Sequence, residues 1–146
     1  MTDENLVREC VLASLKMQTT FRQTIQRSLK RHRIDLTFEM LQLMFRLWTR
    51  EGINQQELAN QTCKDKVSLS YLINNLEKKG LVSRTTDPAD RRNKLIYLTP
   101  EGTELRGTVY PLLTRLYAEA GEQLQETHLQ DTLRYLQEMN ETFQAL

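Results

Sequence analysis

The sequence predicts a mainly α protein with one small β-hairpin, and three observations support that prediction. Apolar residues recur at steps of three and four over both ends of the 146-residue chain, which is the period of an amphipathic helix. Only five glycines and three prolines interrupt the chain, whereas sheet-rich proteins use many such residues in turns. The one stretch rich in Val, Ile, Thr, Leu and Tyr lies between Leu81 and Leu98, where a single hairpin is expected.

Each end of the chain is expected to form one long helix. The first runs from about Asn5 to His32, and its apolar stripe consists of Leu6, Cys10, Ala13, Met17, Phe21, Ile25 and Leu29. The last carries a similar stripe of Leu129, Leu133, Leu136, Asn140 and Phe143. Packing within the chain is one interpretation. We favour a bundle between two chains, because two such stripes exceed what one small core can cover.

Two helices are expected next. Thr37 caps a helix that runs to about Arg50 and is apolar nearly all round, which is typical of a buried central helix. Asn54 then caps a short helix with Glu57 in the capping-box position. The backbone amides of Gln55 and Gln56 would begin this helix, where free N–H groups can hold a phosphate.

A further helix is predicted from about Asp65 to Lys79, ending at Gly80. It buries Leu69, Leu72, Ile73 and Leu76, whereas the opposite side carries Lys64, Val67, Ser68, Ser70, Tyr71, Asn74 and Lys78, with Lys66 in the first turn. A solvated polar face has the same composition. As the second helix of a helix-turn-helix, however, this side suits a DNA major groove, where hydroxyls and amides can bond base edges.

The predicted hairpin has strands at Leu81–Thr86 and Lys94–Leu98, joined by the turn-forming run Asp87–Asp90. Its tip carries Arg91 and Arg92 beside Asp90, and Arg84 lies in the first strand. An aspartate can orient an arginine for a narrow minor groove, although a salt-bridged turn in water has the same residues. Thr99 and Pro100 then begin a helix that reaches about Ala120.

Charge is divided unevenly along a chain whose formal net charge is only +1. Residues 62–98 hold eight lysines and arginines against four carboxylates, whereas residues 99–146 hold three arginines against eight carboxylates. A basic middle segment indicates a polyanionic partner. The rival interpretation is a helical interaction module that binds an acidic protein through the same surface.

Several function classes find no support in the residues. The two histidines form no HExxH pair, and there is no glycine-rich phosphate loop or nucleophile motif. We therefore expect a protein that is not an enzyme and has no cofactor or metal. Without a signal peptide or membrane-spanning run, a cytoplasmic location is expected. Cys10 and Cys63 are expected to be reduced thiols, with Cys10 packed in the apolar stripe.

The run LEKKGLVSRTTDPADRRNKLIYLTPEG resembles the MarR family of winged helix-turn-helix transcriptional regulators. IDLTFEMLQLMFRLW and INQQELANQT also resemble the family's second and third helices. The resemblance covers Leu36 to Gly102 well and the terminal helices by length and position. Arg92, and with it Arg91, matches the family's wing-tip arginine, and Asp90 matches the aspartate that supports it. Ala89 and Tyr71 depart from the pattern, since arginines are common at both positions.

The resemblance implies a homodimeric DNA-binding regulator of transcription. Residues 1–34 and 101–146 would form the helical dimerisation region, and residues 35–100 the winged helix-turn-helix domain that reads a pseudo-palindromic operator. A repressor controlled by a small aromatic effector is the expectation, with Met17, Phe21, Met44, Trp48 and Tyr110 as a cleft if they are not simply core. A peroxide-sensing branch of the family uses a thiol in the first helix, so redox sensing through Cys10 is the alternative. The expected DNA contacts are Gln55, Gln56, Lys64, Lys66, Val67, Ser68, Ser70, Tyr71, Asn74, Lys78, Arg84, Asp90, Arg91 and Arg92.

Overall fold

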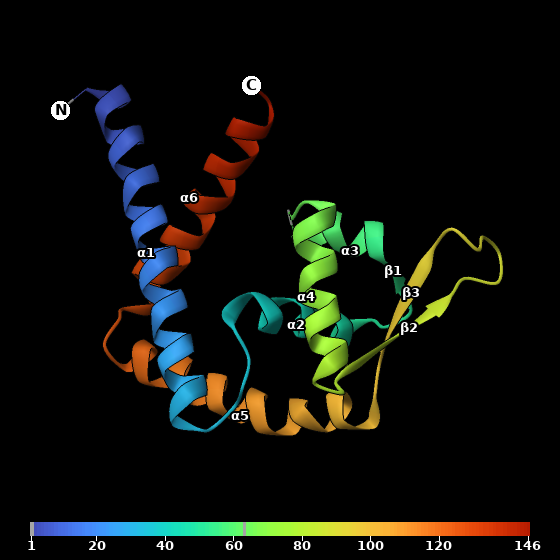
Figure 1. Cartoon of the computed structure of the whole chain (residues 1–146). Helices are drawn as coiled ribbons and strands as arrows, with labels where there is room; N and C mark the ends of the chain where they lie inside the picture. The colour runs from blue at the N-terminus through green and yellow to red at the C-terminus, as the bar shows by residue number, and fades with distance from the viewer. Residues whose placement is uncertain (1, 63) are drawn as a thin grey trace. The chain divides into compact units, whose positions relative to one another are not determined.

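A computed structural model describes residues 2–62 and 64–146. The elements among these residues are α1 (Asp3–Arg31), α2 (Phe38–Thr49), β1 (Ile53–Asn54), α3 (Gln55–Thr62), α4 (Lys66–Lys78), β2 (Val82–Thr86), β3 (Lys94–Leu98), α5 (Pro100–Glu122) and α6 (Glu126–Gln144) (Figure 1). The predicted fold class, mainly helical with a small hairpin wing, is confirmed. The helices begin and end within a few residues of their predicted limits, and α5 continues through Pro111.

Side-chain caps explain where the middle helices begin. The Thr37 hydroxyl accepts the Met40 N–H at 3.2 Å, and the Asn54 amide oxygen accepts the Glu57 N–H at 2.7 Å. At the start of α4 the Asp65 carboxylate accepts the Ser68 N–H at 2.8 Å. Each bond satisfies an N–H group that has no partner within its helix.

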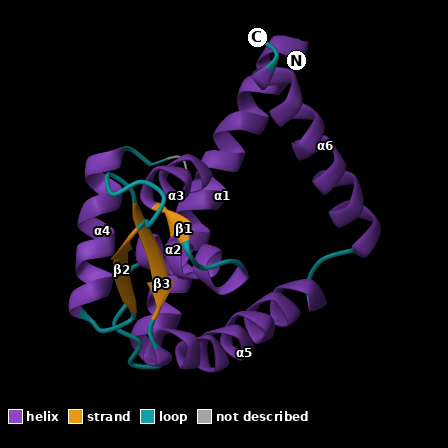
Figure 2. Ribbon diagram, turned by 90° about the vertical axis from the view of Figure 1, so that its right-hand side faces the viewer, coloured by secondary structure: helices purple, strands orange, loops and turns teal. Residues whose placement is uncertain are grey.

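The hairpin belongs to a three-stranded antiparallel sheet with the order β1-β3-β2 (Figure 2). Strands β2 and β3 pair from Val82 opposite Leu98 to Thr86 opposite Lys94, as the prediction of a hairpin requires. The third strand was not predicted. In β1 only Ile53 and Asn54 pair with β3, and two residues are too few to show the alternation that identifies a strand.

Backbone contacts divide the chain into two compact units, Met1–Arg106 and Gly107–Leu146. The core of the first unit draws on every element from α1 to β3, through Ile25, Leu29, Leu41, Leu43, Met44, Leu47, Ile53, Leu58, Leu69, Ile73, Leu76, Val82 and Ile96, all at most 2% exposed. At one edge of this unit the Trp48 indole donates a buried hydrogen bond of 2.8 Å to the Gly102 carbonyl. This bond ties α2 to the first turn of α5.

The second unit holds the rest of α5 and all of α6. None of the residues of α6 is buried. Among the described residues, no helix combines the length and the apolar character needed to cross a membrane.

Candidate nucleic-acid interface

Helix α4 divides its residues between the core and the surface largely as predicted, but the expectation that Leu72 is buried is wrong, because this residue is half-buried and lines an open groove. Leu69, Ile73 and Leu76 are fully buried. On the other side Val67 is 81% exposed and Tyr71 67% exposed. The exposed side is therefore polar with two large apolar groups, and it is available to a partner from solvent.

Four of the predicted contact residues meet in one open groove beside α4. Lys64, Val67, Ser68 and Tyr71 line it together with Leu72 and with Glu39 of α2, and its volume is about 490 Å³. The groove combines an ammonium group, a hydroxyl and an aromatic ring on one surface. These groups can contact phosphates, base edges and thymine methyl groups respectively.

The first turn of α4 is held by Asp65. Its carboxylate accepts both the Ser68 N–H and, at 2.7 Å, the Ser68 hydroxyl. These bonds favour the ionised form, the backbone bond most strongly, and they hold the pKa of Asp65 below its usual value. The Ser68 hydroxyl thus donates its hydrogen bond within the helix, and its oxygen can still accept a hydrogen bond from a partner.

The hairpin projects away from the helices of its unit, with β2 and β3 extending to a free tip (Figure 1). Two aspartates shape that tip. Asp87 accepts the Ala89 N–H at 2.9 Å, and Asp90 accepts the Arg92 N–H at 3.0 Å. Asp90 also accepts the Nε–H of Arg92 at 3.4 Å, while the Arg92 side chain stays 92% exposed. The Nε–H therefore orients the Arg92 guanidinium, while most of the side chain stays open to solvent.

Arg84 differs from the tip arginines. Its side chain is only 20% exposed, and its guanidinium bonds to Asn74, to Glu77 at 3.1 Å and to the Ser70 carbonyl at 3.3 Å. Glu77 was not among the predicted site residues. Glu77 meets Arg84 only because β2 packs against α4, and no spacing along the sequence reveals that packing.

The remaining predicted contacts lie around these two features. Gln55 and Gln56 form the first two positions of α3, and the Gln56 amide bonds to Asn60 at 3.1 Å. Lys66 and Lys78 are exposed at the two ends of α4, and Arg91 is exposed at the hairpin tip. Lys66 and Lys78 are thus separated by the length of α4, whereas Arg91 adjoins Arg92.

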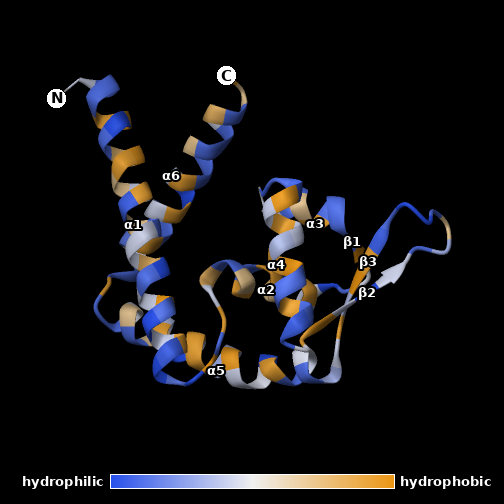
Figure 3. Cartoon of the chain, in the orientation of Figure 1, coloured by the Kyte–Doolittle hydropathy of each residue, from blue (hydrophilic) through white to orange (hydrophobic). Residues whose placement is uncertain are grey.

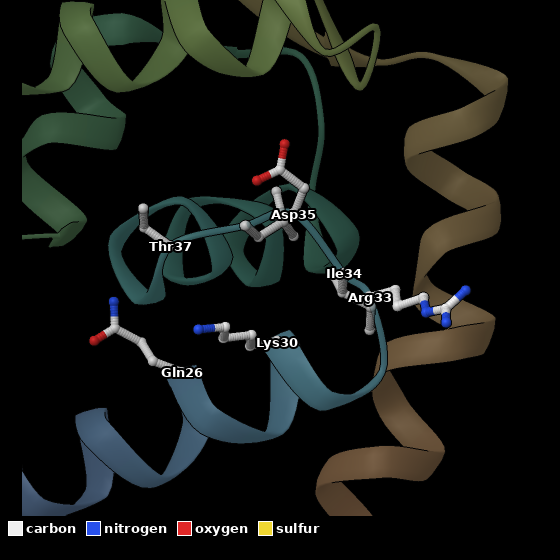
Figure 4. Close-up of a pocket in the computed structure, with 7 residues that line it drawn as sticks. Gln26, Lys30, Arg33, Ile34, Asp35 and Thr37 are labelled. Carbon is white, nitrogen blue, oxygen red and sulfur yellow. The ribbon is translucent and has the colours of Figure 1, made fainter.

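An open pocket lies at the junction of α1 and α2. It has a volume of about 430 Å³ and is lined by Gln26, Lys30, Arg33, Ile34, Asp35, Leu36 and Thr37. In Figure 4, Gln26 and Lys30 extend from α1 toward the segment that leads into α2, whereas Arg33 points away from them. Of the residues expected to form an effector cleft, Met44 and Trp48 are instead buried and Met17 is 61% exposed.

The expectation that Cys10 packs in the core is wrong for the single chain, where this residue is exposed. The apolar stripe of α1 enters the core only at Ile25 and Leu29. Cys63 lies outside the described residues. Among residues 2–62 and 64–146, no three His, Cys, Asp or Glu side chains gather in a way that could hold a metal ion.

Large apolar side chains remain exposed on both terminal helices. Figure 3 marks apolar positions along α1 and α6 in orange. On α1 they include Leu6, Val7, Leu12, Leu15 and Met17, and on α6 Leu129, Leu133, Tyr135, Leu136 and Phe143, each at least 37% exposed. Exposed apolar surface of this extent is typical of a protein interface.

Sequence comparison identifies the relatives of this chain. The sequence model of the MarR family matches residues 36–94. The transcriptional regulator HosA of Escherichia coli O157:H7 is 31% identical over 96 residues, which cover 60% of this chain and 71% of HosA. The chain covers less of other curated relatives, for example 58% of HosA from Escherichia coli O111:H-, at 32% identity over 78 residues and 53% of this chain.

Solved structures extend the similarity to nearly the whole chain. MepR of Staphylococcus aureus in complex with DNA is 25% identical with a TM-score of 0.74, covering 98% of this chain and 99% of MepR. AbsC, a MarR family regulator of Streptomyces coelicolor, has the same fold with a TM-score of 0.81 at 23% identity, covering 100% of this chain and 98% of AbsC. The family match over residues 36–94, the HosA similarity and the observed fold agree, and the chain belongs to the MarR family of winged helix-turn-helix transcriptional regulators.

Proposed function

We propose that this chain is a homodimeric regulator of transcription that binds double-stranded DNA in a sequence-specific way. The observation that supports this most directly is the pairing of an exposed polar face on α4 with a projecting hairpin whose Arg92 is oriented by Asp90. In this proposal α4 enters the major groove and the hairpin tip enters the flanking minor groove, where the negative potential attracts arginine. The amides of Gln55 and Gln56 hold a phosphate.

The proposed contacts fall into two kinds. Val67, Ser68, Tyr71 and Asn74 reach base edges, because they lie on the exposed side of α4. Anchoring to the DNA backbone falls to Gln55, Gln56, Lys64, Lys66, Ser70, Lys78 and Arg91, while Arg92 enters the minor groove with Asp90 behind it. Lys78→Ala should then reduce the salt dependence of binding, whereas Tyr71→Ala should change the preferred sequence.

A second copy of the chain is the proposed cover for the exposed apolar residues of α1 and α6. Helix α6 has nineteen residues and buries none of them in the single chain, although it carries Leu133 and Phe143 at 59% and 50% exposure. A helix with an unburied apolar stripe gains little by forming alone. Residues 1–34 and 101–146 would then form the dimerisation region. The two copies of α4 would lie about 34 Å apart, which is one turn of the duplex.

We extend the proposal to a cytoplasmic repressor that a small aromatic molecule releases from its operator. The pocket at the α1–α2 junction, of about 430 Å³, falls in the size range of small-molecule sites. A panel of aromatic acids and phenols tested for release of bound DNA checks this part. A compound that acts equally on wild type and on Lys30→Ala would place its site elsewhere.

The experiment that tests DNA binding is a salt titration with a random-sequence duplex. Binding at low salt should weaken steeply as salt rises, because each neutralised phosphate contributes about 0.9 to the slope of log K against log salt. A protein that binds no duplex in dilute buffer, yet retains an acidic protein on the same surface, would instead be an interaction module.

Redox sensing through Cys10 is the second candidate, and the exposure of this thiol in the single chain supports testing it. Peroxide should release wild-type protein from DNA if the thiol is the sensor. Cys10→Ser should then stay bound under the same treatment. Equal release of both proteins would exclude Cys10 as the sensor.

A further inference from the structure

The guanidinium of Arg84 joins the hairpin to helix α4. Arg84 lies in β2, and its three partners Ser70, Asn74 and Glu77 are spaced at four and three residues along α4. That spacing places all three on one side of the helix. The Nη1 atom donates to the Asn74 side-chain oxygen and to Glu77, and Nη2 donates to the Ser70 carbonyl.

Chemistry fixes which atom of the Asn74 amide faces Arg84. A guanidinium carries only hydrogen-bond donors, so its partner on an amide must be the oxygen. The Asn74 NH₂ group then lies on the other branch of the amide, and Asn74 itself is exposed. A free asparagine can present either its oxygen or its NH₂ group to a partner. Because Arg84 occupies the oxygen of Asn74, the NH₂ group is the one that remains for a partner.

Arg84 is poorly placed to contact DNA itself. Its side chain is 20% exposed, against 92% for Arg92. Its Nε–H is buried without a hydrogen-bond partner among the residues that the structure describes, and Glu77 already balances its charge. Any new phosphate contact would require Arg84 to give up bonds to α4, and hydrogen bonds that involve charged groups are among the stronger ones in proteins.

We propose that Arg84 is a positioning residue that presents the Asn74 NH₂ group to a hydrogen-bond acceptor on a base edge. This proposal rests on the proposed function. In the major groove the acceptors are guanine N7 and O6, adenine N7 and thymine O4. Asn74 therefore determines sequence preference at one base pair of each half-site, and Arg84 acts through Asn74 without touching the duplex.

The variant that isolates the donor is Asn74→Asp. Aspartate keeps an oxygen for Arg84, so the link between hairpin and helix survives, but it has no N–H to give a base. Selection of bound sequences from a random duplex pool should show that preference at one base pair per half-site falls about tenfold, the scale of one lost base contact. Asn75→Asp makes the same chemical change one residue away and should keep the preference, which controls for the added negative charge.

Arg84 is tested by Arg84→Met and Arg84→Lys, with melting temperature as the check on folding. Arg84→Met should lose preference at the same base pair as Asn74→Asp, with the salt slope unchanged, because no phosphate contact is removed. Arg84→Lys keeps a donor for Asn74 and should restore most of the preference. In an Asn74→Ala background Arg84→Met should have no further effect on that base pair, which a general structural role would not predict.

Two results would overturn the proposal while leaving DNA binding intact. One is Asn74→Asp with unchanged base preference. The other is a fall in salt slope of about one unit per chain in Arg84→Met, which would make Arg84 a phosphate contact. If the wild-type chain binds no duplex even at low salt, the proposed function itself fails, and this inference fails with it.

Discussion

Gly102 offers a quantitative test of how the unit Met1–Arg106 is held together. A Cβ added at this position would lie 2.0 Å from the Leu81 carbonyl oxygen. That oxygen cannot move aside easily, because it also accepts the Thr99 N–H at 3.1 Å. Gly102 itself is held on both sides, since its N–H bonds to the Thr99 hydroxyl at 3.0 Å and its carbonyl accepts the Trp48 indole at 2.8 Å. Gly102→Ala must therefore displace one backbone segment from the other.

The expected cost follows from these contacts. Forcing a group into a filled space costs about 1–3 kcal/mol, and loosening the Trp48 or Thr99 bond adds about 0.5–1.5 kcal/mol. Against this, alanine stabilises a helix by about 1 kcal/mol relative to glycine. These terms combine to a net loss of about 0.5–3.5 kcal/mol. Because the added Cβ would lie only 2.0 Å from a backbone atom, the upper part of that range applies, about 2–3.5 kcal/mol, equivalent to a melting temperature lower by roughly 4–14 °C for a chain of this size.

Gly107 provides the matched control, because it lies in the same helix and an added Cβ there meets no atom of the described residues within 4 Å, apart from its own stretch of helix backbone. Gly107→Ala should be neutral or raise the stability by up to about 1 kcal/mol. Thermal unfolding followed by far-UV circular dichroism, at one protein concentration, compares the two variants with wild type. A Gly102→Ala protein that melts within about 2 °C of wild type would refute the close approach of Gly102 to Leu81.

Three further outcomes are expected. Arg92→Ala should strongly weaken binding to a selected operator and leave the melting temperature nearly unchanged, because its guanidinium is proposed to enter the minor groove and an exposed ion pair contributes at most about 1 kcal/mol to stability; equal affinity of the variant, or a fold that melts much earlier, would contradict this. Since the pKa of Asp65 lies below its usual 3.8 in the folded chain, its charge stabilises the fold above that pH, and this contribution is lost as pH falls through the lower folded pKa. Urea unfolding should thus show Asp65→Asn less stable near neutral pH, with the difference vanishing in acid; a constant difference would speak against the charge. Leu133→Glu should give monomers in analytical ultracentrifugation while Gln130→Glu stays dimeric, and a dimeric Leu133→Glu protein would exclude this stripe as the interface.

Much of the fold could be predicted because its signals are local. Thr37, Asn54 and Asp65 cap helices through bonds that span three residues, and Gly80 ends α4 with a φ of 73°, which most other residues disfavour. The two-residue strand β1 has no such signal, because it exists only where Ile53 and Asn54 meet β3.

The candidate site divides in the same way. The sequence alone determined the separation of α4 into a buried side and a polar side, and the aspartate beside the tip arginines, since periodicity and short spacing fix both. Only the tertiary structure decided that Arg84 turns inward to Asn74 and Glu77 while Arg92 turns outward. An arginine in a strand has the same local pattern in either case, and its direction is set by which helix the strand packs against.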